Sequence, residues 1–264
     1  MINIKLMKGV IAILSVGLLI SCEGKQRESA QPNLNSSFQE WCDRRYSLSI
    51  ESQKTIEAIL DRINADNCRV AARRLANYPT LNLANSKLED LNPLASLTHL
   101  KSLDLSFNSI VDLSPLSYLI DLEELKLDNN QIQDLTPLSS LKKLRKLILD
   151  NNQMTEIIPL AELTELEWLD LGFNQIVEIQ SLANLTQLKH LHLIQNQISD
   201  VRPLTQLVQL EELLLFGNQI TDPTPLAVLT NLKSLWIAGN PVDRCPMEDP
   251  KVCNCKFGSE DCDF

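Results

Sequence analysis

The sequence predicts an α/β solenoid, a curved stack of short parallel strands with a helical N-terminal cap and a cysteine-rich C-terminal cap. Three observations predict it. A Leu-x-Leu motif returns at a fixed interval along the chain. Cysteines gather at both ends, and none lies between residues 69 and 244. An asparagine recurs with a period of 22 residues, at Asn108, Asn130, Asn152, Asn174, Asn196, Asn218 and Asn240.

The 22-residue repeat has a physical logic. In a strand, residues two apart point to the same face, so both leucines of a pair such as Leu103 and Leu105 point inward. One repeat cannot bury that face alone, whereas stacked repeats share a continuous core. An asparagine amide both donates and accepts, so stacked asparagines can satisfy backbone groups that the coil would otherwise bury.

The pattern resembles the leucine-rich repeat in its 22-residue, internalin-like form, over eight repeats in residues 80–242. That resemblance implies a curved solenoid with a parallel sheet on the concave face and a non-catalytic role in protein binding. With the N-terminal features described next, the chain is similar to a bacterial leucine-rich-repeat lipoprotein. The likeness to internalins covers the repeats only, and invasion of host cells is not inferred from it.

Residues 1–21 have the composition of a lipoprotein signal peptide. Lys5 and Lys8 precede an apolar run that is too short to span a membrane. The run ends at Cys22, where the sequence resembles a lipobox whose cysteine is lipidated; the alternative is an ordinary secretory signal. Residues 22–37 are predicted to be this cysteine and a flexible tether. We expect a lipid-anchored protein of the bacterial cell envelope, in the outer membrane of a two-membrane cell because Glu23 replaces the aspartate typical of inner-membrane retention.

Both ends of the solenoid require covers. Residues 38–79 are predicted to form a two-helix cap, and residues 243–264 a cysteine-rich cap. Six cysteines remain if Cys22 carries lipid, which predicts three disulfides in an oxidising compartment. We expect Cys42 to pair with Cys68. The other four either pair among themselves or form a zinc site, although their spacing lacks C-x2-C motifs: Cys245, Cys253, Cys255 and Cys262.

The return path of each repeat contains a short helical turn. Proline opens most of these turns, and the residues before it are predicted N-caps at Asn92, Ser114, Thr136 and Thr224. An acid lies three residues before each proline position, as at Asp112. This row of carboxylates either binds cations or complements the N-termini of the turns, and the second interpretation is favoured.

Three outward positions per strand form the concave face, where repeat proteins usually bind. The first half of this face carries small and charged residues, and the second half carries large ones. Exposed aromatics mark binding surfaces, which predicts a partner-binding patch at Trp168, Asp170, His190, His192, Ile194, Glu212, Leu214, Phe216 and Trp236. The alternatives are that these side chains pack on one another or that the C-terminal cap covers them.

The two histidines of that patch raise the question of a metal. His190 and His192 share one face of a strand, with Asp170 beside His192 and Glu212 beside His190. Ligands on an open sheet rarely converge, so no metal and no cofactor is predicted.

Net charge and the absence of catalytic motifs exclude several classes of function. A net charge of −10 disfavours binding to nucleic acid. No G-x-S-x-G, P-loop or H-E-x-x-H motif is present, so no catalytic residue is predicted. We expect a monomeric, non-enzymatic module that binds an unknown protein partner; the alternatives are an envelope glycan- or peptide-binding module and a purely structural spacer.

Overall fold

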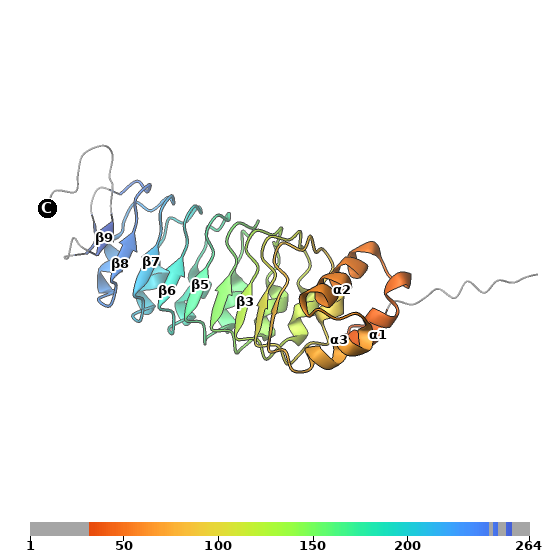
Figure 1. Cartoon of the computed structure of the whole chain (residues 1–264). Coiled ribbons are helices and arrows are strands. Elements are labelled where there is room, and N and C mark those ends of the chain that lie inside the picture. The colour runs from red at the N-terminus through yellow and green to blue at the C-terminus, as the bar shows by residue number, and fades with distance from the viewer. Residues whose placement is uncertain (1–31, 243–244, 248–251, 255–264) are drawn as a thin grey trace, which may run out of the picture. The chain divides into compact units, whose positions relative to one another are not determined.

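The computed structural model describes residues 32–242, 245–247 and 252–254 (Figure 1). For residues 253 and 254 only the backbone is described. The predicted signal peptide, Cys22, Cys255 and Cys262 lie outside the described residues.

One parallel sheet runs through the repeats in strand order β1 to β9. Each strand pairs with the next one in a register shifted by 22 residues, as Leu103 with Leu125. Figure 1 shows the strands stacked side by side in sequence order. The strands are β1 (Thr80–Asn82), β2 (Ser102–Asp104), β3 (Glu124–Lys126), β4 (Lys146–Ile148), β5 (Trp168–Asp170), β6 (His190–His192), β7 (Glu212–Leu214), β8 (Ser234–Trp236) and β9 (Cys253–Asn254).

The leucines form a single core behind this sheet. Leu103 lies in its strand and Leu105 just after it, and both are fully buried, as the alternating pattern predicts. The same buried cluster continues from Phe38 in the N-terminal cap to Val242 at the end of the last repeat. Each repeat therefore depends on its neighbours for burial of its apolar side.

The repeated asparagines form a ladder of hydrogen bonds between repeats. Asn152 shows the pattern: its Nδ2 donates to the carbonyls of Leu127 and Leu149, both at 3.0 Å. Its Oδ1 accepts from the backbone N–H of Ile132 at 2.9 Å. Asn130, Asn152, Asn174, Asn196 and Asn218 are buried, so their amides replace the water that these backbone groups would otherwise need.

The position directly before each ladder asparagine has a left-handed backbone. It is glycine at Gly217 and Gly239, but phenylalanine at Phe107 and Phe173, both with φ above 50°. A bulky residue is uncommon in that region. Both phenylalanines are exposed, at 57% and 55%, which places them on the rim of the sheet.

Short 3-10 helices fill the return path, and their capping differs from the prediction. They are η2 (Asn92–Leu94), η3 (Ser114–Tyr118), η4 (Thr136–Ser140), η5 (Ile158–Glu162), η6 (Gln180–Asn184), η7 (Arg202–Gln206) and η8 (Thr224–Val228). The predicted caps Asn92, Ser114, Thr136 and Thr224 are the first helical residues and cap nothing through their side chains.

At five of these seven helices, an aspartate two residues before the helix start performs the capping, whereas η5 and η6 have Glu156 and Glu178 at that position. Asp112 Oδ1 accepts from the Ser114 N–H at 2.8 Å, and Asp134 accepts from Thr136 at 2.8 Å. The carboxylates at positions 90, 200 and 222 do the same. An aspartate side chain readily reaches the N–H two residues ahead, so the five aspartates of the acidic row have a structural explanation.

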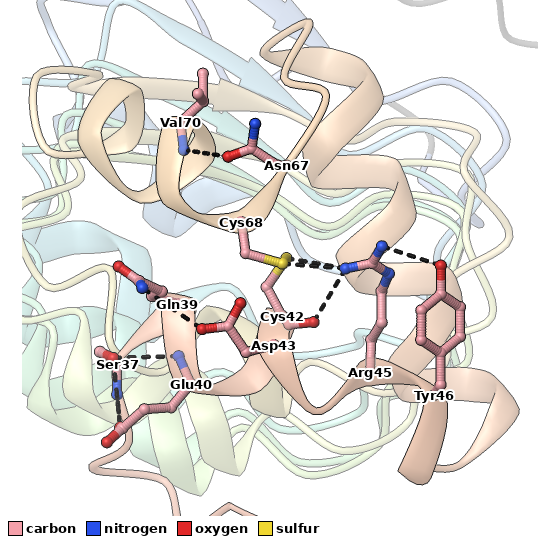
Figure 2. The surroundings of a disulfide bond; sticks show 10 residues. All are labelled: Ser37, Gln39, Glu40, Cys42, Asp43, Arg45, Tyr46, Asn67, Cys68 and Val70. Atoms are coloured by element: carbon pink, nitrogen blue, oxygen red, sulfur yellow. Dashed lines mark hydrogen bonds between the residues drawn. A yellow bond between two sulfur atoms is a disulfide. The ribbon is translucent and has the colours of Figure 1, made fainter.

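The N-terminal cap contains three α-helices rather than the predicted two: α1 (Phe38–Asp43), α2 (Ile50–Arg62) and α3 (Cys68–Leu75). Ser37 begins α1 with a capping box, which makes this extra helix possible despite its shortness. The expected disulfide joins Cys42 of α1 to Cys68 of α3 (Figure 2). Arg45 donates to the carbonyl of Cys42 at 3.2 Å beside it.

The C-terminal end is described in part. β9 pairs with β8 and so extends the sheet beyond the eighth repeat. Cys245 is disulfide-bonded, which agrees with disulfides rather than zinc at this cysteine. Among the described residues, no helix has the length and apolarity needed to cross a membrane.

Candidate binding face

The concave face divides into three regions along the repeats. Its side chains come from the first and third residues of each strand and from the residue two beyond the strand. Parallel register brings equivalent residues of successive repeats next to one another, as His192 with Leu214. A residue's repeat number therefore decides which neighbours it meets.

The first region, on β2 to β4, is covered by ion pairs. Lys126 lies 3.8 Å from both Asp104 and Glu124, and Lys146 lies 3.4 Å from Glu124. These partly exposed pairs satisfy one another and leave a mixed-charge surface.

Trp168, predicted as an exposed binding residue, instead packs on its neighbours. Its ring stacks on His190 with centroids 4.3 Å apart and meets the edge of His192 at 5.4 Å. The Lys146 ammonium lies 5.3 Å from the same ring. The alternative that outward side chains pack on each other therefore holds for Trp168, because flat rings on adjacent strands lie within stacking distance.

His192 is the centre of the second region. Its Nδ1 lies 3.0 Å from Asp170 Oδ2, and its Nε2 lies 3.0 Å from Glu212 Oε1. Glu212 is the in-register neighbour of His190, as predicted, and its side chain reaches diagonally to His192. His190 Nδ1 is 3.5 Å from the other oxygen of Glu212, too far for a good hydrogen bond.

The pKa values of His192 and Asp150 both depart from the ordinary values of these residues, through burial and neighbouring charges. Burial lowers the pKa of His192, but the hydrogen bonds and charges of Asp170 and Glu212 outweigh it, and the net pKa is raised. Asp150 is half-buried in the repeat of β4, next to that of Asp170. Burial, and then the charges of Asp170 and Asp128, raise its pKa to about 6. The second region is therefore a compact set of interacting carboxylates centred on the His192 imidazole.

The third region, on β7 and β8, is apolar and more exposed. Phe216 is 39% exposed and Trp236 is 46% exposed. Leu214 pairs in register with Trp236, and Ile194 extends the apolar surface toward β6. A Cβ at Gly239 would lie 3.2 Å from the Phe216 ring, so the absence of a side chain at this position leaves room for that ring.

One row of charges was missed by the sequence analysis. The residue directly before each of the strands β2 to β8 alternates in sign: Lys101, Glu123, Arg145, Glu167, Lys189, Glu211 and Lys233. Neighbours pair along the row, as Lys189 with Glu167 at 2.7 Å and Lys233 with Glu211 at 2.7 Å. A comparison of this one position across the repeats would have found it.

The side chains of the face can also be compared with the requirements of a metal site. Within the described ranges, no three histidine, cysteine or acidic side chains converge as a metal site requires. Both ring nitrogens of His192 already face carboxylates. The arrangement offers an apolar platform beside a charged one, which suits recognition of another molecule.

Comparisons with known proteins agree with this architecture. The family model described as "Leucine Rich repeats (2 copies)" matches residues 80–118, 120–162, 164–206 and 208–246. Members of that family generally act as protein-interaction modules. A search of proteins with curated functions returns no match.

Solved structures give three informative likenesses. An internalin (inlF) of Listeria monocytogenes is 37% identical with a TM-score of 0.63, over 69% of this chain and 54% of that one. Internalin C2 of the same species is 31% identical with a TM-score of 0.70, over 76% of this chain and 91% of that one. A leucine-rich repeat protein of Leptospira interrogans is 28% identical with a TM-score of 0.63, over 71% of this chain and 50% of that one.

The extent of these matches differs. The chain spans about half the length of the first internalin and of the Leptospira protein, and nine-tenths of internalin C2. The match of the repeat model over most of the chain, together with the likeness to internalin C2, shows that the chain belongs to the leucine-rich repeat family.

Proposed function

We propose that this protein is a non-catalytic module of the bacterial cell envelope that binds a protein partner through its concave face. The observation that carries the proposal is the third region, where Phe216 and Trp236 expose large rings on adjacent repeats. Large exposed aromatic side chains contribute disproportionately to protein–protein binding energy. The plant receptor RGFR1, 25% identical over 57% of this chain with a TM-score of 0.52, was solved with RGF2, so the fold accommodates a bound partner in that protein.

In this proposal, fewer residues contact the partner directly than the sequence predicted. Leu214, Phe216 and Trp236 form its core, with Ile194 at the edge. Trp168 and His190 stack on each other and act as its support, whereas Asp170, His192 and Glu212 supply the polar rim. An apolar centre beside a polar rim is the usual anatomy of a protein interface.

The test compares the chain with its Phe216→Ala/Trp236→Ala variant in capture from envelope extract, followed by titration of each captured protein in purified form. We expect at least tenfold weaker binding by the variant, since two aromatic anchors are removed. Phe107→Ala is the matched control, because Phe107 is exposed on the rim of an early repeat. Its binding should equal that of the parent.

A double variant that folds and still binds as the parent does would exclude the third region as the protein site. Glycan arrays would then test the sugar-binding alternative. Tolerance of every concave substitution would favour the structural spacer.

The membrane anchor is part of the same proposal. The signal sequence and Cys22 support lipidation, and Glu23 supports an outer-membrane location in a two-membrane cell. Metabolic labelling with an alkyne fatty acid should label the parent and not Cys22→Ser. Labelling of both, or of neither, would contradict the anchor without affecting the concave site.

A further inference from the structure

The two contacts of His192 fix its charge on geometric grounds. A neutral imidazole has one N–H and one lone pair, so it can donate to only one acceptor. Both ring nitrogens of His192 lie 3.0 Å from carboxylate oxygens. A lone pair at that distance from a carboxylate would be repelled, so the arrangement favours the imidazolium, which donates from both nitrogens.

We propose that His192 is a proton-dependent clamp that ties β5, β6 and β7 together at the centre of the concave face. Asp170 comes from β5, His192 from β6 and Glu212 from β7, so the proton joins three successive repeats. This inference does not rest on the proposed partner, since the clamp lies within the chain itself.

The groups around His192 favour this state from every neighbouring strand. Asp170 faces it from β5 and Glu212 from β7, and the charge of Asp150 beyond β4 lies close enough to interact with it. His190, on the same strand, approaches the second oxygen of Glu212. The His192 side chain is only 13% exposed, so water cannot readily replace a lost hydrogen bond.

The direction of the pH dependence follows from these contacts. Burial opposes the charge of His192, but the two carboxylates raise its pKa above the ordinary histidine value. A raised pKa means that the clamp is fully present below about pH 6.5, the value of an unfolded chain, and is lost as pH rises through the folded value. Loss of the proton leaves the imidazole a single N–H, so only one of Asp170 and Glu212 keeps its donor while both stay charged. The same ring makes the edge contact with Trp168.

Nuclear magnetic resonance of the full chain with ¹⁵N-labelled histidine tests the charge directly. The chain has three histidines, so His99→Gln, His190→Gln and His192→Gln assign the signals. We expect both nitrogens of His192 to be protonated at pH 7. Asp170→Asn and Glu212→Gln should each lower its midpoint by about one pH unit. A neutral His192 at pH 7, or a midpoint that neither variant moves, would overturn the clamp.

Thermal unfolding supplies an independent readout. The parent should lose stability relative to His192→Gln as the pH rises from 6.5 to 9, because glutamine keeps a donor but does not titrate. His190→Gln is the matched control and should retain the parent's pH dependence. Parallel curves for the parent and His192→Gln would contradict the clamp, and if His192→Gln does not fold, the resonance experiment on the carboxylate variants decides the question.

Discussion

The asparagine ladder and the concave face are both rows of side chains repeated every 22 residues, yet they differ in how they vary. The ladder has the same residue in seven successive repeats, and each amide makes the same bonds to the repeat before it. The concave face changes from ion pairs on β2 to β4, through the His192 cluster, to exposed aromatics on β7 and β8.

The comparison separates two tasks. Positions that bond the same backbone groups in every repeat are identical, because the loss of one amide leaves a buried N–H without its acceptor. Positions that face solvent do not bond these backbone groups, so they are free to differ from repeat to repeat according to what each part of the face contacts. The substitutions below test that separation in order of decreasing expected effect.

The largest expected effect is in the ladder. Asn152→Ala leaves the Ile132 N–H without its acceptor. It also removes one of the two amide donors to each of Leu127 O and Leu149 O, which keep their bonds to Asn130 and Asn174. A buried group left unpaired costs about 1–3 kcal/mol and each other lost hydrogen bond about 0.5–1.5 kcal/mol, so the free energy of unfolding should fall by roughly 2–4 kcal/mol in urea titrations. Asn184→Ala, an exposed asparagine in η6, is the control and should change stability by less than about 0.5 kcal/mol. Equal losses of stability in the two variants would contradict the claim that the ladder asparagines stabilise the fold more than exposed asparagines do.

A smaller effect is expected in the alternating charge row. Lys189→Glu places an acid between Glu167 and Glu211 and breaks a 2.7 Å ion pair. Because these side chains are largely exposed, the loss should be about 1 kcal/mol or less at low salt and should shrink at high salt. Lys87→Glu changes the net charge equally outside the row, and a loss of the same size in that variant would show that position within the row is irrelevant.

The fold was predictable because it depends on periodicity, which the sequence displays directly. Leu103 and Leu105 had to share a face, and Asn152 had to satisfy backbone groups; both follow from spacing and side-chain chemistry alone. The third helix of the cap was missed because α1 is only six residues long and begins with a local capping box. Capping by Asp112 rather than Ser114 was missed because the helix begins one residue earlier than its proline suggests.

The site was less predictable because its contacts depend on side-chain conformation. The register that places Glu212 beside His190 was predicted and is confirmed, but the diagonal reach of its long side chain to His192 was not predicted. Trp168 was expected to be free because it faces outward, yet an aromatic neighbour in register, His190, covers it. Phe216 and Trp236 are exposed as expected, because neither has an aromatic partner in register.

The smallest expected effect concerns Asp150, at the centre of the concave face, where solvent-facing positions are predicted to be tolerant. Burial and the charges of Asp170 and Asp128 raise its pKa to about 6, so its ionised form opposes folding at neutral pH. Asp150→Asn keeps the shape and an oxygen acceptor but removes this charge. We therefore expect the variant's Tm to exceed the parent's by about 1–3 °C at pH 7.5. The difference should vanish near pH 4, where Asp150 of the folded parent is already protonated.

Glu165→Gln is an equal change in net charge at an exposed position. A rise shared by both variants would point to net charge rather than to the cluster, and a fall in Asp150→Asn would show that its carboxylate stabilises this face as the ladder stabilises the coil.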